Sequence, residues 1–239
     1  MSIQSGVLKR ILSKTSFSMA SQDVRYYLNG MLLELEGSKV NGVATDGHRL
    51  AFSSAQSVSG GLEVRNILPR KAVLELSKLL STGEETVDLM IGPSYVDVKC
   101  QNLSFSSKLI DGKYPDYDKV FPTGDPLPLE ISKDLLQSAL SRASVLSNEK
   151  YRGVRFQLSK GKLKLTANNP EQESAEEVLD VVYEGVELEV GFNIGYLLDV
   201  LNSIESETVH FEFYGEDSSC IIKESGSEDD VYVIMPMRL

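Results

Sequence analysis

The sequence predicts an α+β protein made of two tandem copies of one unit, each with two helices packed on mostly antiparallel sheets. A length of 239 residues suits two domains of about 120 residues each. Helical patterns alternate with short strand-like runs in the same order in both halves. Regular self-similarity of this kind indicates a duplicated unit. Equivalent positions recur at offsets of 122 to 124 residues: Gly30 with Gly153, Val87 with Val209, and Lys99 with Lys223.

The first half begins with a helix, since apolar residues recur at helical spacing from Val7 to Leu12. Residues 27–35 alternate like a strand. Residues 40–53 predict a strand, a turn and a second strand, because Asp46-Gly47 is a strong hairpin pair. Pro69 starts a second helix over residues 69–80. Further strands are expected at residues 87–91, 96–100 and 103–109.

The second half repeats this order after a linker at residues 111–118, so we expect domains at residues 1–116 and 117–239. The acidic segment 224–230 is typical of a solvated hairpin tip. Helices are expected at residues 133–146 and 194–204, and strands at 151–158, 162–167, 178–182, 188–191, 209–214, 220–223 and 231–235.

Composition indicates a globular cytoplasmic protein. The chain is 41% hydrophobic and 25% charged, and no apolar run approaches the length of a membrane span. Its start lacks the pattern of a secretory signal, so we expect Cys100 and Cys220 to be reduced. The net charge of −11 repels phosphate, and any contact with DNA must come from a local basic face.

No catalytic signature emerges from the sequence, and we expect no enzyme, metal site or cofactor. Asp46 and His48 could form an acid–base pair, but no nucleophile is indicated beside them, and the hairpin explains Asp46. His210 falls in an expected strand, which favours a structural role. The acid spacing of residues 111–118 faintly resembles a calcium loop, but Pro115 and the lack of a downstream glutamate argue against metal binding.

Basic residues lie on or beside three of the four expected helices. In an acidic protein, they would form a helix-lined surface that tolerates phosphate. The alternative is that lysines and arginines decorate any solvated helix face. The fourth helix, which has Asp199 and no basic residue, weakens the pattern. The residues in question are Lys9, Arg10, Lys14, Arg70, Lys71, Lys133, Arg142, Lys150 and Arg152.

The C-terminal segment Tyr232-Val-Ile-Met-Pro-Met-Arg-Leu239 is unusually apolar for a chain end. Pro236 should end the last strand and leave the tail on a surface. Flexible methionines suit a groove wall that adapts to apolar side chains. A tail tucked into the core is the alternative.

Several long segments closely resemble the bacterial DNA polymerase III β sliding clamp. They are Ala44-Thr-Asp-Gly-His-Arg-Leu-Ala51, Val233-Ile-Met-Pro-Met-Arg-Leu239, Phe17-Ser-Met-Ala-Ser-Gln-Asp-Val-Arg-Tyr-Tyr-Leu-Asn-Gly30, Ser147-Asn-Glu-Lys-Tyr-Arg-Gly153 and Ala167-Asn-Asn-Pro-Glu-Gln-Glu173. The resemblance covers essentially the whole chain, with proteobacterial clamps nearest. Clamps of this family have three similar domains and close as dimers into a six-domain ring. Because this chain resembles only the middle and last domains, we expect that it cannot form that ring in the usual way.

The resemblance implies an inner wall of helices around duplex DNA and a groove, between the two domains, for linear peptides of polymerases, the clamp loader and repair proteins. It places Arg25, Arg70, Lys71, Tyr151 and Arg152 at the DNA. Position 119 is Lys where related clamps often carry Arg. The implied groove residues are Leu28, Thr45, Gly47, His48, Arg49, Leu50, Pro115, Lys119, Val120, Asn193, Tyr196, Ser219, Val233, Ile234, Met235, Pro236, Met237 and Arg238.

We therefore predict a clamp-like processivity scaffold that encircles duplex DNA. Three chains of two domains would restore a six-domain ring, so a homotrimer is expected in preference to a monomer. The main alternative is a peptide-binding fragment that cannot encircle DNA and competes for clamp partners. A hydrolase centred on Asp46 and His48 is a distant third interpretation.

Overall fold

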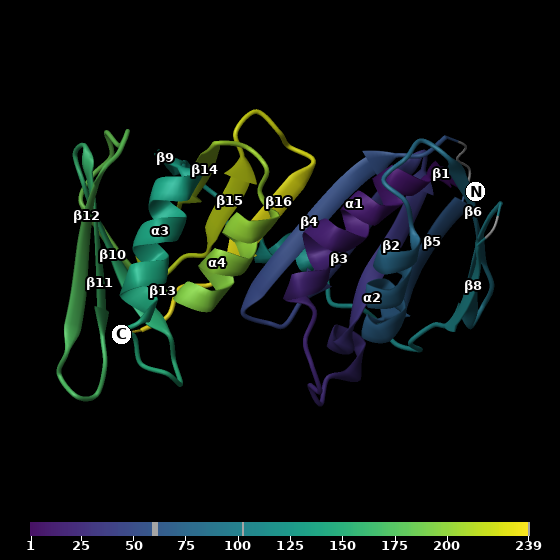
Figure 1. Ribbon diagram of the computed structural model, residues 1–239, viewed down its shortest axis with the longest axis horizontal. Coiled ribbons are helices and arrows are strands. Elements are labelled where there is room, and N and C mark those ends of the chain that lie inside the picture. The colour runs from purple at the N-terminus through teal and green to yellow at the C-terminus, as the bar shows by residue number, and fades with distance from the viewer. Residues whose placement is uncertain (59–61, 102, 239) are drawn as a thin grey trace. The chain divides into compact units, whose positions relative to one another are not determined.

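The computed structural model describes residues 1–58, 62–101 and 103–238. The chain divides into an N-terminal unit, Met1–Pro115, and a C-terminal unit, Asp116–Leu239. In each unit two α-helices pack on antiparallel sheets (Figure 1). The predicted fold class is confirmed. Leu239, which closes the tail motif, lies outside the described residues.

The N-terminal unit contains helices α1 and α2 and strands β1 to β8. Its elements are β1 (Ser2–Gln4), α1 (Ser5–Thr15), β2 (Gly30–Gly37), β3 (Lys39–Thr45), β4 (Arg49–Gln56), β5 (Leu62–Pro69), α2 (Arg70–Leu79), β6 (Thr86–Ile91), β7 (Tyr95–Cys100) and β8 (Leu103–Lys108), with 3-10 turns at Ser16–Ser18 and Tyr26–Asn29.

The C-terminal unit contains helices α3 and α4 and strands β9 to β16. Its elements are β9 (Leu127–Ser132), α3 (Lys133–Ser144), β10 (Gly153–Ser159), β11 (Lys162–Asn168), β12 (Ser174–Asp180), β13 (Leu188–Asn193), α4 (Ile194–Ser203), β14 (Thr208–Phe213), β15 (Cys220–Glu224) and β16 (Asp230–Ile234), with a 3-10 turn at Tyr117–Val120.

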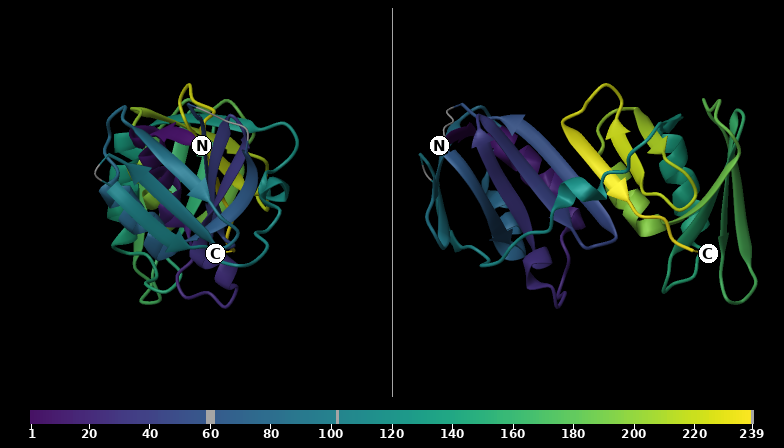
Figure 2. Two further views of the ribbon diagram at one scale, coloured as in Figure 1. Left: turned by 90° about the vertical axis from the view of Figure 1, so that its right-hand side faces the viewer. Right: turned by 180° about the vertical axis from the view of Figure 1, so that it is seen from behind.

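Strand pairing is the same in both units. In the N-terminal unit the strands pair in the orders β5-β2-β3-β4 and β1-β6-β7-β8. In the C-terminal unit the equivalent orders are β13-β10-β11-β12 and β9-β14-β15-β16. Each unit can be followed from both sides in Figures 1 and 2. This one-to-one correspondence supports the duplication that the sequence predicts.

Even the link between the two helices is repeated. In the N-terminal unit, Lys9 Nζ on α1 donates to the carbonyl oxygen of Leu80, directly after α2, at 2.9 Å. In the C-terminal unit, Lys133 Nζ on α3 donates to the carbonyl oxygen of Ile204, directly after α4, also at 2.9 Å. A lysine that reaches a helix C-terminus satisfies a carbonyl that has no partner within the helix.

Helix α1 buries one apolar face against the sheets of its unit. On α1, Leu8, Ile11 and Leu12 are almost fully buried and pack with Val87 and Val98 of β6 and β7 in one core cluster. Spacing of three and four residues places these side chains on one face. Such burial is the main driving force for folding, at about 1.5 to 3 kcal/mol for each large apolar side chain.

Aromatic side chains form part of the C-terminal core. Phe156 and Phe192 meet edge to face with ring centroids 5.3 Å apart, and Phe211 stacks on Phe213 at 5.8 Å. All four side chains are buried. Ring pairs at these separations stabilise a core beyond their area alone.

The structure also departs from the sequence prediction. Residues 27–29, expected to start a strand, belong to a 3-10 turn, and β12 begins four residues before the expected strand at 178. Strands β1, β5 and β9 were not predicted. β9 carries Pro128, which a strand tolerates here because β9 pairs on one side with β14 and lies at the edge of its ladder.

Among the described residues, no helix is both long enough and apolar enough to cross a membrane.

Candidate functional site

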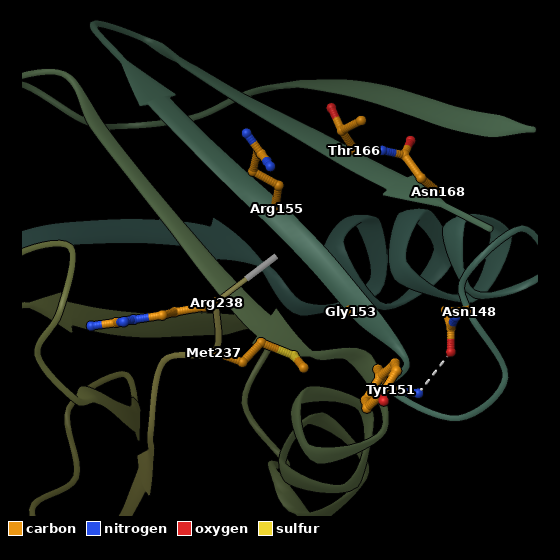
Figure 3. A pocket seen from close by; sticks show the side chains of 8 residues that line it. All are labelled: Asn148, Tyr151, Gly153, Arg155, Thr166, Asn168, Met237 and Arg238. Atoms are coloured by element: carbon orange, nitrogen blue, oxygen red, sulfur yellow. Dashed lines mark hydrogen bonds between the residues drawn. The ribbon is translucent and has the colours of Figure 1, made fainter. Parts of the chain in front are cut away.

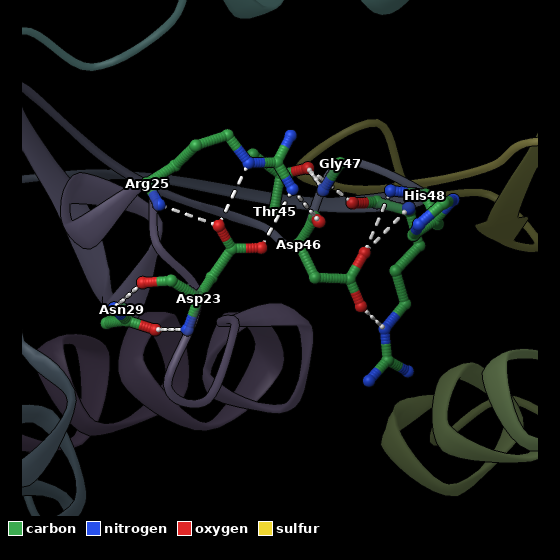
Figure 4. Close-up of polar contacts among 8 residues, drawn as sticks. Asp23, Arg25, Asn29, Thr45, Asp46, Gly47 and His48 are labelled. Carbon is green, nitrogen blue, oxygen red and sulfur yellow. Dashed lines mark hydrogen bonds and ion pairs between the residues drawn. The ribbon is translucent and has the colours of Figure 1, made fainter.

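The turn that joins β3 to β4 is organised by Asp46. One carboxylate oxygen of Asp46, Oδ1, accepts the backbone N–H groups of His48 and Arg49 at 2.9 and 3.1 Å. The other, Oδ2, accepts Arg49 Nε at 3.0 Å. Gly47 has φ +91°, a conformation that glycine adopts without strain. The predicted hairpin pair is therefore present, and it leaves His48 exposed at the tip (Figure 4).

Residues from elsewhere in the N-terminal unit form hydrogen bonds and a cation–π contact with this turn. Arg49 Nη2 donates to the carbonyl oxygen of Phe17 at 2.7 Å, and the guanidinium lies 5.5 Å from the centroid of the Phe17 ring. The hydroxyl of Tyr114 accepts the backbone N–H of Thr45 at 3.1 Å. Burial raises the pKa of Tyr114, so its hydroxyl stays protonated.

A second loop, residues 23–29, contacts the turn through Arg25 (Figure 4). Arg25 donates to both carboxylate oxygens of Asp23, at 3.0 and 2.9 Å, and Nη2 also reaches the carbonyl oxygen of Asp46 at 3.1 Å. The hydrogen bonds from Arg25 lower the pKa of Asp23 to about 2. Asn29 closes the loop by exchanging hydrogen bonds with the backbone of Asp23. Arg25, predicted to face DNA, thus carries an intramolecular ion pair.

The C-terminal tail begins where β16 ends at Ile234. Val233 and Ile234 are fully buried, whereas Met235 is 41% exposed. Pro236 cannot donate to a sheet, which explains why the strand stops before it. The Met237 N–H then donates to the carbonyl oxygen of Gly191 at 2.9 Å and ties the tail to β13. The tail is accordingly neither an extension of the sheet nor a buried segment.

The N-terminus of α4 organises another part of the C-terminal unit. Asn193 caps the helix, since its Oδ1 accepts the backbone N–H of Tyr196 at 3.2 Å. Its Nδ2 donates to the carbonyl oxygen of Tyr151 at 3.2 Å. Asn193 and Tyr196 are half-buried, and Tyr151 is exposed.

The remaining groove candidates differ in exposure. Leu28 and Leu50 are at most 2% exposed, so they support the surface from beneath. Pro115 and Lys119 are exposed, and Lys119 Nζ pairs with Asp116 at 2.8 Å. Thr45 is buried, and Val120 and Ser219 are half-buried. The role of these residues in peptide binding stays a prediction.

A pocket with a volume of about 360 Å³ opens in the C-terminal unit (Figure 3). One side is formed by residues of β10 and β11, and the other by Tyr151 and the tail residue Met237. Sequence motifs singled out the tail and the segments that contain Asn148, Tyr151, Gly153 and Asn168. They gave no signal for Arg155 and Thr166, which only sheet pairing brings to the pocket. The lining residues are Asn148, Tyr151, Gly153, Arg155, Thr166, Asn168, Met237 and Arg238.

Many of the predicted DNA-facing cations already have partners inside the chain. Lys9 and Lys133 bind helix-end carbonyls, and Arg142 pairs with both carboxylate oxygens of Glu177 at 2.7 and 2.9 Å. Arg10 and Arg70 donate to the backbone of Ser54 and Met19, Lys14 is buried, and Lys71, Lys150 and Arg152 are exposed.

The structure offers no arrangement for catalysis at Asp46 and His48. The carboxylate of Asp46 is occupied by two backbone N–H groups and by Arg49. His210 lies on β14, with Glu130 and Glu212 at 3.8 and 3.6 Å from its ring nitrogens. Within the described ranges, no group of three or more His, Cys, Asp or Glu side chains could hold a metal ion.

Family comparison accounts for both units. The model of the DNA polymerase III beta subunit, central domain, matches residues 2–116, and that of its C-terminal domain matches residues 118–238. The beta sliding clamp of Salmonella typhimurium is 50% identical over 232 residues, which cover 97% of this chain and 63% of the relative. The beta sliding clamp of Pseudomonas aeruginosa is 48% identical over 239 residues, which cover 100% of this chain and 65% of the relative. The chain thus spans less than two thirds of the length of these relatives.

Solved structures agree with this result. The crystal structure of the Pseudomonas aeruginosa sliding clamp bound to griselimycin superposes with a TM-score of 0.97 at 48% identity, covering 100% of this chain and 65% of that one. The Caulobacter crescentus pol III beta structure gives a TM-score of 0.93 at 34% identity, covering 100% of this chain and 66% of that one. These relatives are sliding clamps, accessory replication proteins and not enzymes. With both of its units matched, this chain belongs to the DNA polymerase III beta subunit family of sliding clamps.

Proposed function

We propose that this chain acts as a sliding clamp that tethers replication and repair proteins through linear peptides. The observation that carries the proposal is a match to a sliding clamp that covers the whole of this chain and 65% of the clamp, at 48% identity and a TM-score of 0.97. The accessible parts of the Asp46 turn and of the tail support peptide binding. An extended peptide gains affinity from backbone contacts and from apolar pockets for its side chains.

The tail supplies apolar side chains for peptide binding. Met235 is exposed, while Pro236 and Met237 are half-buried, and the segment follows directly on the buried strand residues Val233 and Ile234. Methionine side chains adapt to different partners because they are unbranched and polarizable. A tethering protein that serves several polymerases and repair enzymes needs such adaptability.

Griselimycin provides a direct test, because it is bound in the structure of the Pseudomonas aeruginosa relative. We expect this chain to bind griselimycin in isothermal titration calorimetry, and Met235→Ala to weaken binding about tenfold, since a lost apolar contact of about 1.4 kcal/mol corresponds to that factor. Met90→Ala is the matched control, because Met90 on β6 is 44% exposed, close to the 41% of Met235. Equal losses in the two variants, or no binding by the parent chain, would contradict the peptide role.

We further propose that three chains close into a ring around duplex DNA. Two units per chain and three chains give the six domains that a ring of this family requires. A closed ring is held topologically, so it needs only weak phosphate contacts, which suits a net charge of −11. Light scattering should then report three times the 26.4 kDa mass of one chain. A monomer at micromolar concentration would count against the ring.

A specific observation favours the second candidate, a peptide-binding fragment that does not encircle DNA. Lys9, Lys133 and Arg142 use their charges in bonds within the chain, which leaves fewer cations for phosphate. Retention on nicked circular DNA that is lost on linearisation would support the ring. Griselimycin binding without such retention would support the fragment.

A further inference from the structure

The pocket between Tyr151, the tail and strands β10 and β11 has two chemically different sides (Figure 3). The ring of Tyr151 and the thioether of Met237 form an apolar side. Arg155 on β10 and Asn168 on β11 form a polar side. A volume of about 360 Å³ lies at the small end of the range for ligand sites in proteins, which suits one or two residues of a peptide.

The apolar side is held in position by the chain itself. Asn148 Oδ1 accepts the backbone N–H groups of Lys150 and Tyr151 at 2.9 and 3.0 Å. Asn193 Nδ2 donates to the carbonyl oxygen of Tyr151, and Met237 is tied to Gly191. The backbone at Tyr151 is therefore organised before any ligand arrives, which lowers the entropic cost of binding, whereas Met237 is fixed by a single hydrogen bond.

Hydrogen-bond donors predominate on the polar side. Nη1 of Arg155 pairs with Glu189 at 2.5 Å. Within the described part of the chain, Nε and Nη2 of Arg155 and the side-chain amide of Asn168 have no protein partner. A guanidinium presents its donors in a planar fork that matches a carboxylate. The group that this side accepts best is thus a small anionic acceptor.

The charge around the pocket supports the same conclusion. Lys150 and Arg152 flank Tyr151 in the sequence, and Arg238 contributes to the lining. These cations stand in a chain whose net charge is −11. Glu149 precedes Lys150 and Glu189 pairs with Arg155, so these cations are partly neutralised and suit a single carboxylate better than a polyphosphate chain.

We propose that this pocket binds an aromatic residue and an adjacent carboxylate of a partner peptide. The aromatic ring lies against Tyr151 and Met237, and the carboxylate accepts hydrogen bonds from Arg155 and Asn168. This inference deepens the proposed peptide role, since Met237 belongs to both surfaces, and it selects partners that carry an acidic residue beside an aromatic one. Ring pairs and charge-assisted hydrogen bonds supply the affinity.

The test uses the full chain, with its methionine methyl groups labelled with carbon-13, and two dipeptides, N-acetyl-Phe-Asp-amide and N-acetyl-Phe-Asn-amide. We expect the Met237 methyl signal to shift with both dipeptides and the Asp form to bind about tenfold more tightly, because only that form brings a charged acceptor. Arg155→Gln should abolish this preference. Tyr151→Ala should weaken both dipeptides about threefold to tenfold. Arg142→Gln removes a guanidinium elsewhere in the same unit and should change neither result.

Three outcomes would overturn the proposal: equal affinity for the two dipeptides, an unchanged preference in Arg155→Gln, or a Met237 shift with thymidine monophosphate and none with the dipeptides. Griselimycin added to the same samples tests the peptide groove separately. If the parent chain binds the dipeptides but not griselimycin, the groove is rejected and the pocket is kept. If it binds griselimycin but not the dipeptides, the pocket alone is rejected.

Discussion

The Asp46 turn and the C-terminal tail are both prominent in the sequence, but the fold holds them in opposite ways. Every oxygen of the Asp46 carboxylate is occupied, Arg49 is tied to Phe17, and Thr45 is tied to Tyr114. Among the described residues after Ile234, the tail has one backbone hydrogen bond, from Met237 to Gly191. The turn is therefore a rigid template, whereas the tail is anchored at one point and free to adapt.

With the proposed peptide role, this difference would combine specificity at the turn with tolerance at the tail. A rigid turn positions its backbone and His48 with little entropy left to lose on binding. A loosely held methionine segment can repack against different side chains. We expect the mutational costs to follow the same division.

The largest effect is expected for Asp46→Ala. The change leaves two backbone N–H groups without their acceptor and leaves Arg49, which is largely buried, without its carboxylate. Hydrogen bonds to charged groups contribute about 1.5 to 3 kcal/mol, so we expect a loss of about 2 to 3 kcal/mol in the free energy of unfolding, measured with urea. Asp125→Ala, at an exposed carboxylate, is the control and should change stability by less than about 0.5 kcal/mol. Similar losses in both variants would show that the turn is not a rigid template.

A smaller loss is expected for Gly47→Ala. The residue at this position has φ +91°, and an added Cβ atom would lie 2.9 Å from Nη1 of Arg25. Left-handed backbone costs about 1 to 2 kcal/mol for a residue with a side chain, and Arg25 must also move. We expect a loss of this size in urea unfolding. Gly161→Ala, also at positive φ but with open space around its Cβ, isolates the backbone cost from the contact with Arg25. A Gly47→Ala loss below that of Gly161→Ala would contradict the contact.

The tail should respond much less to truncation. Met237 is half-buried, so Met237→Ala should reduce the free energy of unfolding by less than about 0.5 kcal/mol. Hydrogen exchange gives a second measure, since the Met237 amide should exchange much faster than amides of the buried strand β16, where opening requires unfolding of the sheet. Equal protection of Met237 and Val233 would mean that the tail is as rigid as the strand.

The smallest effect concerns the loop that braces the turn. Arg25 lowers the pKa of Asp23 to about 2, below the value of an unfolded carboxyl. Because the folded pKa is the lower one, the stabilisation is present above pH 4 and is lost as pH falls toward 2. A carbon-13 titration of the Asp23 carboxyl should show this midpoint, and Arg25→Gln should raise it toward the usual value. An unchanged midpoint in Arg25→Gln would exclude the ion pair as its cause.

Much of the fold could be predicted because its signals are local. The apolar spacing of α1, the Asp46-Gly47 pair and the stop at Pro236 depend on a few adjacent residues. Strand β1 could not, because three residues are too few to show a pattern, and β5 gains its identity by pairing with β2. The 3-10 turn at Tyr26–Asn29 interrupts an alternation that otherwise reads as a strand.

The same division applies to the candidate site. The sequence by itself determined the duplicated plan, the turn and the exposed apolar tail, because hydrophobic period and turn chemistry are written along the chain. Tertiary structure alone decided that Lys9 and Lys133 bind helix ends, that Tyr114 braces Thr45, and that Arg155 and Asn168 share a pocket with Met237. These contacts join residues tens of positions apart, and their partners are chosen by the packing of helices and strands, which no local pattern encodes.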